Sequence, residues 1–329
     1  TLKINNSIVE NCAYSVASKT TSVLYNLGSV VLNNVVMRDN HSLHKDNVTT
    51  EGGIIFSKGN LEIVNSIFEY NRNTTVSQHT SKVGGGVICM YGNGLTTEIT
   101  LKVTNSIFNN NYAHYTTNEN YGGRGGAIYA NTNTNVLIYN CEFNNNYSNQ
   151  GGGALGLYNC VNVEIKDCIF ENNYTNASAD SCYGTAVDIQ TATSAKVDNC
   201  YFYRNGISGS GRGSLSIREV KNITLTNTEF DYNLAYASGA SFYILNSTTA
   251  NSEATLDNVY VHNNYQTLND YSGTIAYLNL NATGKATVTN SRFSGNTNRH
   301  NIAYNSMFYF IAGELTLDNL DFKNNVNRG

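Results

Sequence analysis

Hydrophobic and polar residues alternate in short runs along the whole chain, and the clearest copy of the pattern lies at residues 151–173. Its sequence, GGGALGLYNCVNVEIKDCIFENN, contains two runs with apolar residues at alternate positions, 154–157 and 161–165. Such period-two alternation is typical of a β-strand with one buried face. The second run is followed by Phe170 and, three residues later, by Asn173. The pattern predicts two or three short strands in each unit of this length.

The motif Leu-x-Ile-x-Asn-x-x-Phe-x-x-Asn recurs from one end of the chain to the other. Its Phe position occurs eleven times, and the ten steps from Val9 to Phe322 average about 31 residues. Self-similarity at a period of roughly 20–50 residues indicates a repeat architecture. These anchor positions are Val9, Met37, Phe68, Phe108, Phe143, Phe170, Phe202, Phe230, Val261, Phe293 and Phe322.

A second apolar run precedes each anchor and is introduced by small residues, as in Gly-Gly-Ala-Ile at 125–128. No stretch of useful length shows the 3.6-residue period of a helix. Short strands in a unit of about 31 residues, without helices, predict a parallel β-helix. We therefore expect an all-β, right-handed parallel β-helix solenoid of about eleven coils, with residues 1–329 forming a single segment.

Stacked coils place the same motif position directly above itself at the roughly 4.8 Å spacing of paired strands. The Phe positions then form a dry core. The Asn positions form a ladder of side-chain amides that bond along the axis, and Asn also suits the left-handed backbone of a tight bend. The first coil has Cys12 in place of Asn. The predicted ladder consists of Asn40, Asn71, Asn111, Asn146, Asn173, Asn205, Asn233, Asn264, Asn296 and Asn325.

Two copies of the repeat combine its best motifs, Gly-Gly-Ala followed by Ile or Leu, and then Phe-x-x-Asn. They lie at 125–128 with 143–146, and at 152–155 with 170–173. These residues resemble the repeat of the chlamydial polymorphic outer-membrane proteins, and the resemblance spans nearly the whole chain. It implies a surface-exposed β-helix like the passenger region of those adhesins.

Composition excludes several classes of function. Only 13% of residues are charged, against about 25% in an ordinary soluble domain, and the net charge of −4 argues against a nucleic-acid partner. The chain has no proline, as expected for a molecule built almost wholly of hydrogen-bonded strands. No apolar run of 18 residues is present, so we expect no membrane span in this segment.

Both ends of the chain fall inside the repeat pattern. We therefore expect a piece of a longer repeat protein, because an uncovered end coil would expose unpaired strand edges. The expected partners are further coils or caps of the same protein, with end-to-end self-assembly as one version. Glycans or other ligands on a host or cell surface are further expected partners.

Candidate catalytic groups are few. In the strand after the glycines, the outward positions of six coils include one acid, Asp188, with Arg218 and Glu219 nearby. One acid is not a catalytic constellation, since polysaccharide-cleaving sites use several carboxylates. Tyr129 and Tyr243 occupy the same column and are candidates for stacking on sugars. In the carbohydrate alternative Asp188 is a further candidate sugar contact, with the role of an acid or base. We expect no catalytic residue, no metal ligand and no cofactor.

Seven cysteines leave two interpretations open. Cys141, Cys168 and Cys200 share one repeat position, which accepts either Cys or Ser as a small residue. We favour free or partly oxidised thiols over an axial disulfide such as Cys141–Cys168.

Ten Asn-x-Ser/Thr sequons occur, about as many as chance predicts. Those on the ladder, Asn40, Asn146 and Asn173, should point inward. The others that we place at corners or in loops are glycosylation candidates. These candidates are Asn47, Asn73, Asn176, Asn246 and Asn281.

Together these features favour a non-enzymatic structural or adhesive segment of an extracellular or cell-surface β-helix protein. Assembly into a filament and N-glycosylation belong to this expectation. The alternative is a β-helix protein that binds carbohydrate or cleaves polysaccharide.

Overall fold

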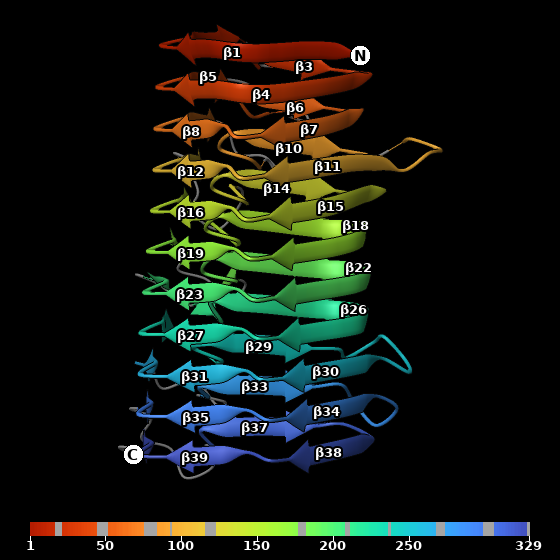
Figure 1. Ribbon diagram of the computed structural model, residues 1–329, viewed down its shortest axis with the longest axis vertical. Helices are drawn as coiled ribbons and strands as arrows, with labels where there is room; N and C mark the ends of the chain where they lie inside the picture. The colour runs from red at the N-terminus through yellow and green to blue at the C-terminus, as the bar shows by residue number, and fades with distance from the viewer. Residues whose placement is uncertain are drawn as a thin grey trace.

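Strands stack in parallel along one long axis in the computed structural model of the chain (Figure 1). The structure describes residues 1–16, 22–44, 52–75, 84–92, 94–115, 123–176, 182–207, 211–235, 238–267, 274–298 and 306–327. As the chain descends from its N-terminus, the front strands in Figure 1 run from right to left. The strands behind them, such as β33, run from left to right. The predicted right-handed parallel β-helix is confirmed.

Three columns of strands make up the coils. The anchor column carries the Leu-x-Ile and Phe positions, and its eleven copies include every anchor residue. Its strands are β1 (Leu2–Glu10), β4 (Ser29–Arg38), β7 (Asn60–Val64), β8 (Ile67–Glu69), β11 (Ile99–Thr104), β12 (Ile107–Asn109), β15 (Thr134–Tyr139), β16 (Glu142–Asn144), β18 (Leu155–Lys166), β19 (Ile169–Glu171), β22 (Val187–Asp198), β23 (Tyr201–Tyr203), β26 (Leu215–Thr226), β27 (Glu229–Asp231), β30 (Glu253–Asp257), β31 (Tyr260–His262), β34 (Lys285–Thr289), β35 (Arg292–Ser294), β38 (Glu314–Asp318) and β39 (Asp321–Lys323).

The glycine column follows the small residues that precede each anchor, and β18, β22 and β26 run through it into the anchor column. Its other strands are β3 (Leu24–Asn26), β6 (Ile55–Ser57), β10 (Ile88–Tyr91), β14 (Ile128–Asn131), β29 (Phe242–Leu245), β33 (Ala276–Asn279) and β37 (Phe308–Ile311).

The third column begins directly after the ladder position and closes each coil. Its strands are β2 (Ala13–Val16), β5 (His41–His44), β9 (Arg72–Thr75), β13 (Tyr112–Tyr115), β17 (Tyr147–Ser148), β20 (Tyr174–Thr175), β24 (Gly206–Ile207), β28 (Leu234–Ala235), β32 (Tyr265–Gln266), β36 (Thr297–Asn298) and β40 (Val326–Asn327). A separate short pair, β21 (Cys182–Tyr183) and β25 (Gly211–Arg212), lies between the third and glycine columns. Within the described residues no helix is long and apolar enough to cross a membrane.

The Phe column forms a continuous stack inside the rod. Phe108, Phe143 and Phe170 are register partners in adjacent coils, and each is fully buried. Successive rings from Phe68 to Phe230 lie 4.7–5.0 Å apart and within 13° of parallel. This spacing equals the spacing of paired strands, so the backbone register itself sets the ring stacking.

The Asn side chains form the expected ladder beside this stack. Each Nδ2 donates to the Oδ1 of the next ladder residue at 2.8–3.1 Å, from Asn40 to Asn325. Each Nδ2 also donates to a backbone carbonyl, as Asn173 does to Phe143 at 2.8 Å. The ladder residues from Asn40 to Asn296 are fully buried, which includes the three ladder sequons.

The left-handed backbone, however, does not lie at the ladder residues. It lies one residue earlier, as at Asn145 (φ 54°) before Asn146, and again at the other bend of the motif, as at Asn140 (φ 50°). At the ladder column, bending and axial bonding therefore belong to different residues, contrary to expectation. At the other bend one Asn does both, since Asn140 Nδ2 donates to Asn105 Oδ1 at 2.9 Å and both residues are left-handed.

All seven cysteines lie in the described residues and are free thiols. Cys141, Cys168 and Cys200 are buried in one column, and each Sγ donates to a carbonyl two residues earlier at 3.1–3.3 Å. A hydrogen bond with Cys168 and burial raise the pKa of Cys141. Burial likewise raises the pKa of Cys168. The Cys141 and Cys168 thiols are therefore protonated and unreactive at neutral pH.

One loop that extends from the rod, between β29 and β30, donates several of its hydrogen bonds to one carboxylate (Figure 1). Glu219 accepts hydrogen bonds from the backbone and hydroxyl groups of Ser247, Thr248 and Thr249 at 2.6–3.3 Å. Although burial opposes the shift, the bonds from Ser247 and Thr248 lower the pKa of Glu219 to about 2.

We expect the Glu219→Gln variant to lose the stability that this carboxylate provides. A lowered pKa means that the stabilisation is present above the unfolded pKa of 4.5 and is lost as pH falls toward 2. Allowing for solvent screening, it amounts to about 1–2 kcal/mol. Melting temperatures of wild type and variant should differ at pH 6 and converge between pH 4.5 and 2. A difference that is constant with pH would contradict this assignment.

Candidate functional site

The outward face of the glycine column is covered by chain, so the sugar contacts predicted there are wrong. Tyr129, Asp188 and Tyr243 point away from the rod's core but are only 3%, 1% and 5% exposed. The segments that lead into the glycine-column strands cover these side chains. Equivalent segments of adjacent coils form parallel β-bridges with one another, as Arg124 does with Gly84 and with Gly151. An outward direction at a strand position does not imply contact with solvent.

Under this cover Asp188 is part of a closed polar cluster. Its carboxylate accepts hydrogen bonds from the Tyr158 hydroxyl and from Arg218 Nη2, the latter at 2.9 and 3.0 Å. The Arg218 guanidinium lies 3.6 Å from the Tyr183 ring centre. Burial and the Asp188 carboxylate raise the pKa of Tyr158. Each charge already has an ionic partner, and Glu219 faces the distant loop instead, so the cluster holds the covering segments in place.

The structure also corrects two glycosylation candidates. Asn73 is 2% exposed and its Nδ2 donates to the carbonyls of Gly84 and Gly85. Asn246 is fully buried and exchanges hydrogen bonds with the backbone of Val220 at 2.6 and 3.0 Å. A glycan needs an accessible amide nitrogen, which neither side chain has.

The structure neither confirms nor excludes glycans at the other three candidates. Asn176 and Asn281 are half-buried and stay predictions, whereas Asn47 lies outside the described residues. In Asn281 the Oδ1 accepts from the backbone and hydroxyl of Thr283, the third residue of its sequon. Its Nδ2 donates to the carbonyls of Asn246 and Thr249 at 3.1 and 3.3 Å, so attachment of a glycan there requires at least one of these bonds to break.

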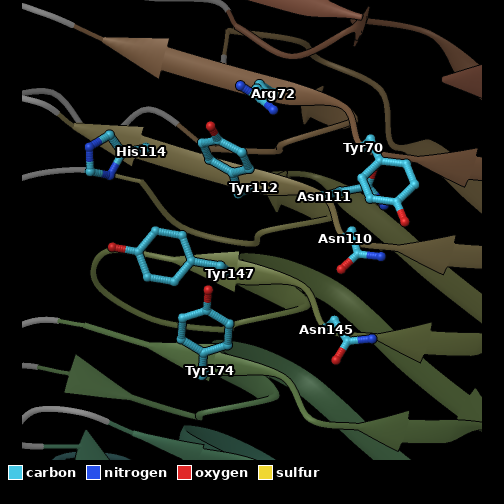
Figure 2. A pocket seen from close by; sticks show the side chains of 9 residues that line it. All are labelled: Tyr70, Arg72, Asn110, Asn111, Tyr112, His114, Asn145, Tyr147 and Tyr174. Atoms are coloured by element: carbon cyan, nitrogen blue, oxygen red, sulfur yellow. The ribbon is translucent and has the colours of Figure 1, made fainter. Parts of the chain in front are cut away.

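An open pocket of about 420 Å³ lies on the third column, where the sequence analysis placed no site. Figure 2 shows Tyr112, Tyr147 and Tyr174 one above another along its length. They are register partners on β13, β17 and β20, and each directly follows a ladder Asn. The Tyr147 and Tyr174 ring centres lie 4.8 Å apart, and those of Tyr112 and Tyr147 lie 6.3 Å apart.

Polar and cationic groups border these rings. Arg72 is the register partner of Tyr112, and its guanidinium lies 5.3 Å from the ring centre. His114 lies on one side of the tyrosines, and Tyr70 and two asparagines lie on the other (Figure 2). Two of the lining asparagines, Asn110 and Asn145, are the left-handed residues of adjacent coils. The Nδ2 of each donates to Asn109 Oδ1, at 3.0 and 3.4 Å.

The arrangement offers aromatic faces with hydroxyls, amide groups and a cationic end. None of the nine described residues that line the pocket is Asp or Glu. The sequence did contain a signal for it, because Asn-Tyr recurs at 111–112, 146–147 and 173–174 and would place tyrosines in register. These tyrosines lie one position beyond the ladder, outside the motif that defines the repeat.

Comparison of the chain with protein-family models, with curated proteins and with solved structures found no match. The functional interpretation therefore depends on the geometry.

Proposed function

We propose that the chain is a non-enzymatic, adhesive segment of an extracellular or cell-surface β-helix protein, and that it binds glycans in the tyrosine pocket. The observation that carries this proposal is the row of tyrosines on β13, β17 and β20, presented beside polar amides. A sugar ring has apolar C–H faces and a polar rim. Tyrosine meets both with an apolar face and a hydroxyl at its edge.

Charge selects the kind of glycan. Arg72 is exposed at one end of the tyrosine row, and the described residues of the lining include no acid that would repel an anion. A guanidinium binds a carboxylate or sulfate through charge-assisted hydrogen bonds. We therefore expect acidic oligosaccharides to bind more tightly than neutral ones of the same length.

Binding is favoured over cleavage. Glycoside hydrolysis normally uses a pair of carboxylates flanking the scissile bond, and the described pocket lining supplies none. Asp188, the acid considered from the sequence, is buried with Arg218. The alternative of a polysaccharide-cleaving protein therefore lacks support at both places.

The resemblance of the repeat to the chlamydial polymorphic outer-membrane proteins supports a location on a surface. A rod of regularly stacked coils also suits a filament, because each new coil pairs with the preceding one in the same way. The filament, and glycans at Asn176 and Asn281, belong to this proposal.

Replacing Tyr147 by Ala tests the proposal, since this ring lies in the middle of the row. We expect at least a tenfold loss of affinity for acidic oligosaccharides, measured by calorimetry with oligogalacturonate and heparin fragments against neutral cello-oligosaccharides. Tyr265→Ala is the matched control, because Tyr265 follows a ladder Asn in a coil outside the pocket. It should change affinity less than twofold.

Three results would contradict the proposal. Wild type could bind none of the oligosaccharides, or both variants could bind as wild type does. Release of new reducing ends from the polysaccharide panel would instead favour the cleaving alternative.

A further inference from the structure

A histidine lies between two carboxylates on the outer side of the anchor column, far along the rod from the tyrosine pocket. His262 Nε2 is 2.7 Å from Glu229 Oε1, and His262 Nδ1 is 3.1 Å from Asp231 Oδ1. One ligand atom from each of the three residues lies within 4.8 Å of the other two.

The repeat register brings the three together. Glu229 and Asp231 flank the core residue Phe230 on β27, so both point outward from the same strand. His262 occupies the position of Asp231 in the next coil, on β31. The backbone hydrogen bonds between β27 and β31 thus fix how far apart the three side chains start, and no loop has to close over them.

The surroundings hold the donors in place. The His262 ring stacks on Tyr260 with centres 4.0 Å apart and planes 17° apart, which limits its rotation. Asp231 is 7% exposed and receives hydrogen bonds from Asn263 Nδ2 at 3.0 Å and from the Tyr201 hydroxyl at 3.3 Å. Asn263 Nδ2 also lies 2.9 Å from His262 Nδ1. The Glu229 side chain is 43% exposed, so an ion can enter from solvent on its side.

We propose that Glu229, Asp231 and His262 bind a divalent transition-metal ion, with Zn²⁺ as the ion that fits best. Imidazole nitrogen and carboxylate oxygen are both zinc donors, and a catalytic type of zinc site combines three protein ligands with a solvent molecule. Zinc bonds of about 2.0–2.2 Å in a tetrahedron separate the ligand atoms by about 3.3–3.6 Å. The two observed contacts join different ring nitrogens, and one ion binds only one of them. An ion at Nε2 has Glu229 beside it, where the 2.7 Å contact opens by less than 1 Å. The ligand atom of Asp231, which lies within 4.8 Å of the others, then moves toward the ion by about 1 Å.

The donor set also selects against the hard cations. Ca²⁺ takes six to eight oxygen ligands and Mg²⁺ prefers oxygen with several waters, whereas an imidazole nitrogen suits Zn²⁺, Cu²⁺ or Ni²⁺. Binding requires the imidazole to be neutral at the coordinating nitrogen, so any proton held there by a carboxylate is released when the ion enters. The ion joins two neighbouring coils, so it should also raise their resistance to unfolding.

Calorimetry of the whole chain, freed of metal by chelator and titrated with Zn²⁺ at pH 7, tests this site. We expect one strongly bound equivalent that a tenfold excess of Ca²⁺ or Mg²⁺ does not displace. His262→Gln should weaken it at least a hundredfold and Glu229→Gln at least tenfold. His41→Gln is the matched control, because His41 lies on a strand of a distant coil and bonds Thr74; it should leave the strong site intact.

The variants are first checked for wild-type circular dichroism and melting temperature without metal. Zinc should then raise the melting temperature of wild type and of His41→Gln, but not that of His262→Gln. Unchanged zinc binding in a folded His262→Gln variant would overturn the proposal, as would the absence of a strong site in wild type. Displacement by Ca²⁺ would show a carboxylate site for hard cations and would overturn it too. The test is independent of glycan binding.

Discussion

Replacing Asn173 by Asp is expected to lower the free energy of unfolding by about 3–5 kcal/mol. The Asn173 Nδ2 donates to the Phe143 carbonyl at 2.8 Å and to Asn205 Oδ1 at 3.0 Å, and its Oδ1 accepts two bonds from Asn146 at 3.0 Å. Asp has the same shape but places an oxygen where the amide donates. Two buried acceptors then face an acceptor, and a carboxyl group is buried without a counter-charge.

Chemical denaturation followed by circular dichroism measures this effect. Asn162→Asp is the control, because Asn162 is exposed and its amide pairs with Asn135 at the surface. The control should change stability by less than about 0.5 kcal/mol. Equal changes in the free energy of unfolding of the two variants would show that burial of the ladder does not determine how much it stabilises the rod.

Replacing Phe170 by Ala should cost a similar amount, about 3–5 kcal/mol. Phe170 is fully buried, and its ring stacks between Phe143 and Phe202 at 5.0 and 4.8 Å. Strands on both sides are fixed by backbone hydrogen bonds, so the neighbouring rings cannot move together to close the gap. Truncation therefore leaves a cavity and removes two aromatic contacts.

Ile169→Ala is the control for this second prediction. Ile169 precedes Phe170 on β19, points to the opposite face and is 39% exposed, so its truncation should cost about 1 kcal/mol or less. Phe170→Leu should recover more than half of the loss because it restores most of the volume. A loss below 1 kcal/mol in Phe170→Ala would contradict a core built on ring stacking.

The sequence predicts the inside of the rod well, because the inside obeys the repeat. Phe143 and Phe170 are register partners, and Asn146 and Asn173 are bonded to each other. Each coil repeats the same spacing from anchor to ladder, so a one-dimensional alignment of motifs places residues correctly in three dimensions.

The outside of the rod does not repeat, and there the predictions fail. The outward strand positions of Tyr129 and Asp188 predict contact with solvent, but segments without a repeat motif cover both side chains. Asn246 looked like a loop residue, yet it bonds the backbone of the coil before it. Burial on this side depends on the course of each inserted segment, which period and alternation do not describe.

Both candidate sites lie at positions that recur in every coil, but their residue types occur in only a few neighbouring coils. The tyrosines after Asn111, Asn146 and Asn173 repeat and could have been found by aligning one position further. His262 and Asp231 could be paired by register, but Glu229 joins them only through alternation on its own strand. The distances that make a metal site come from side-chain rotamers, which the sequence does not specify.

The direction of the ladder has a mechanical consequence. The hydrogen bonds between its side-chain amides, like those between neighbouring strands, point along the long axis. A force that pulls the two ends of the rod apart therefore acts on every interface between neighbouring coils. The rod then yields where a terminal coil peels away, while the remaining coils keep all of their contacts. Each coil of about 31 residues that comes loose adds about 100 Å of extended chain. Such a molecule lengthens under tension in discrete steps, and each step is reversed when the coil pairs again with the strand below it.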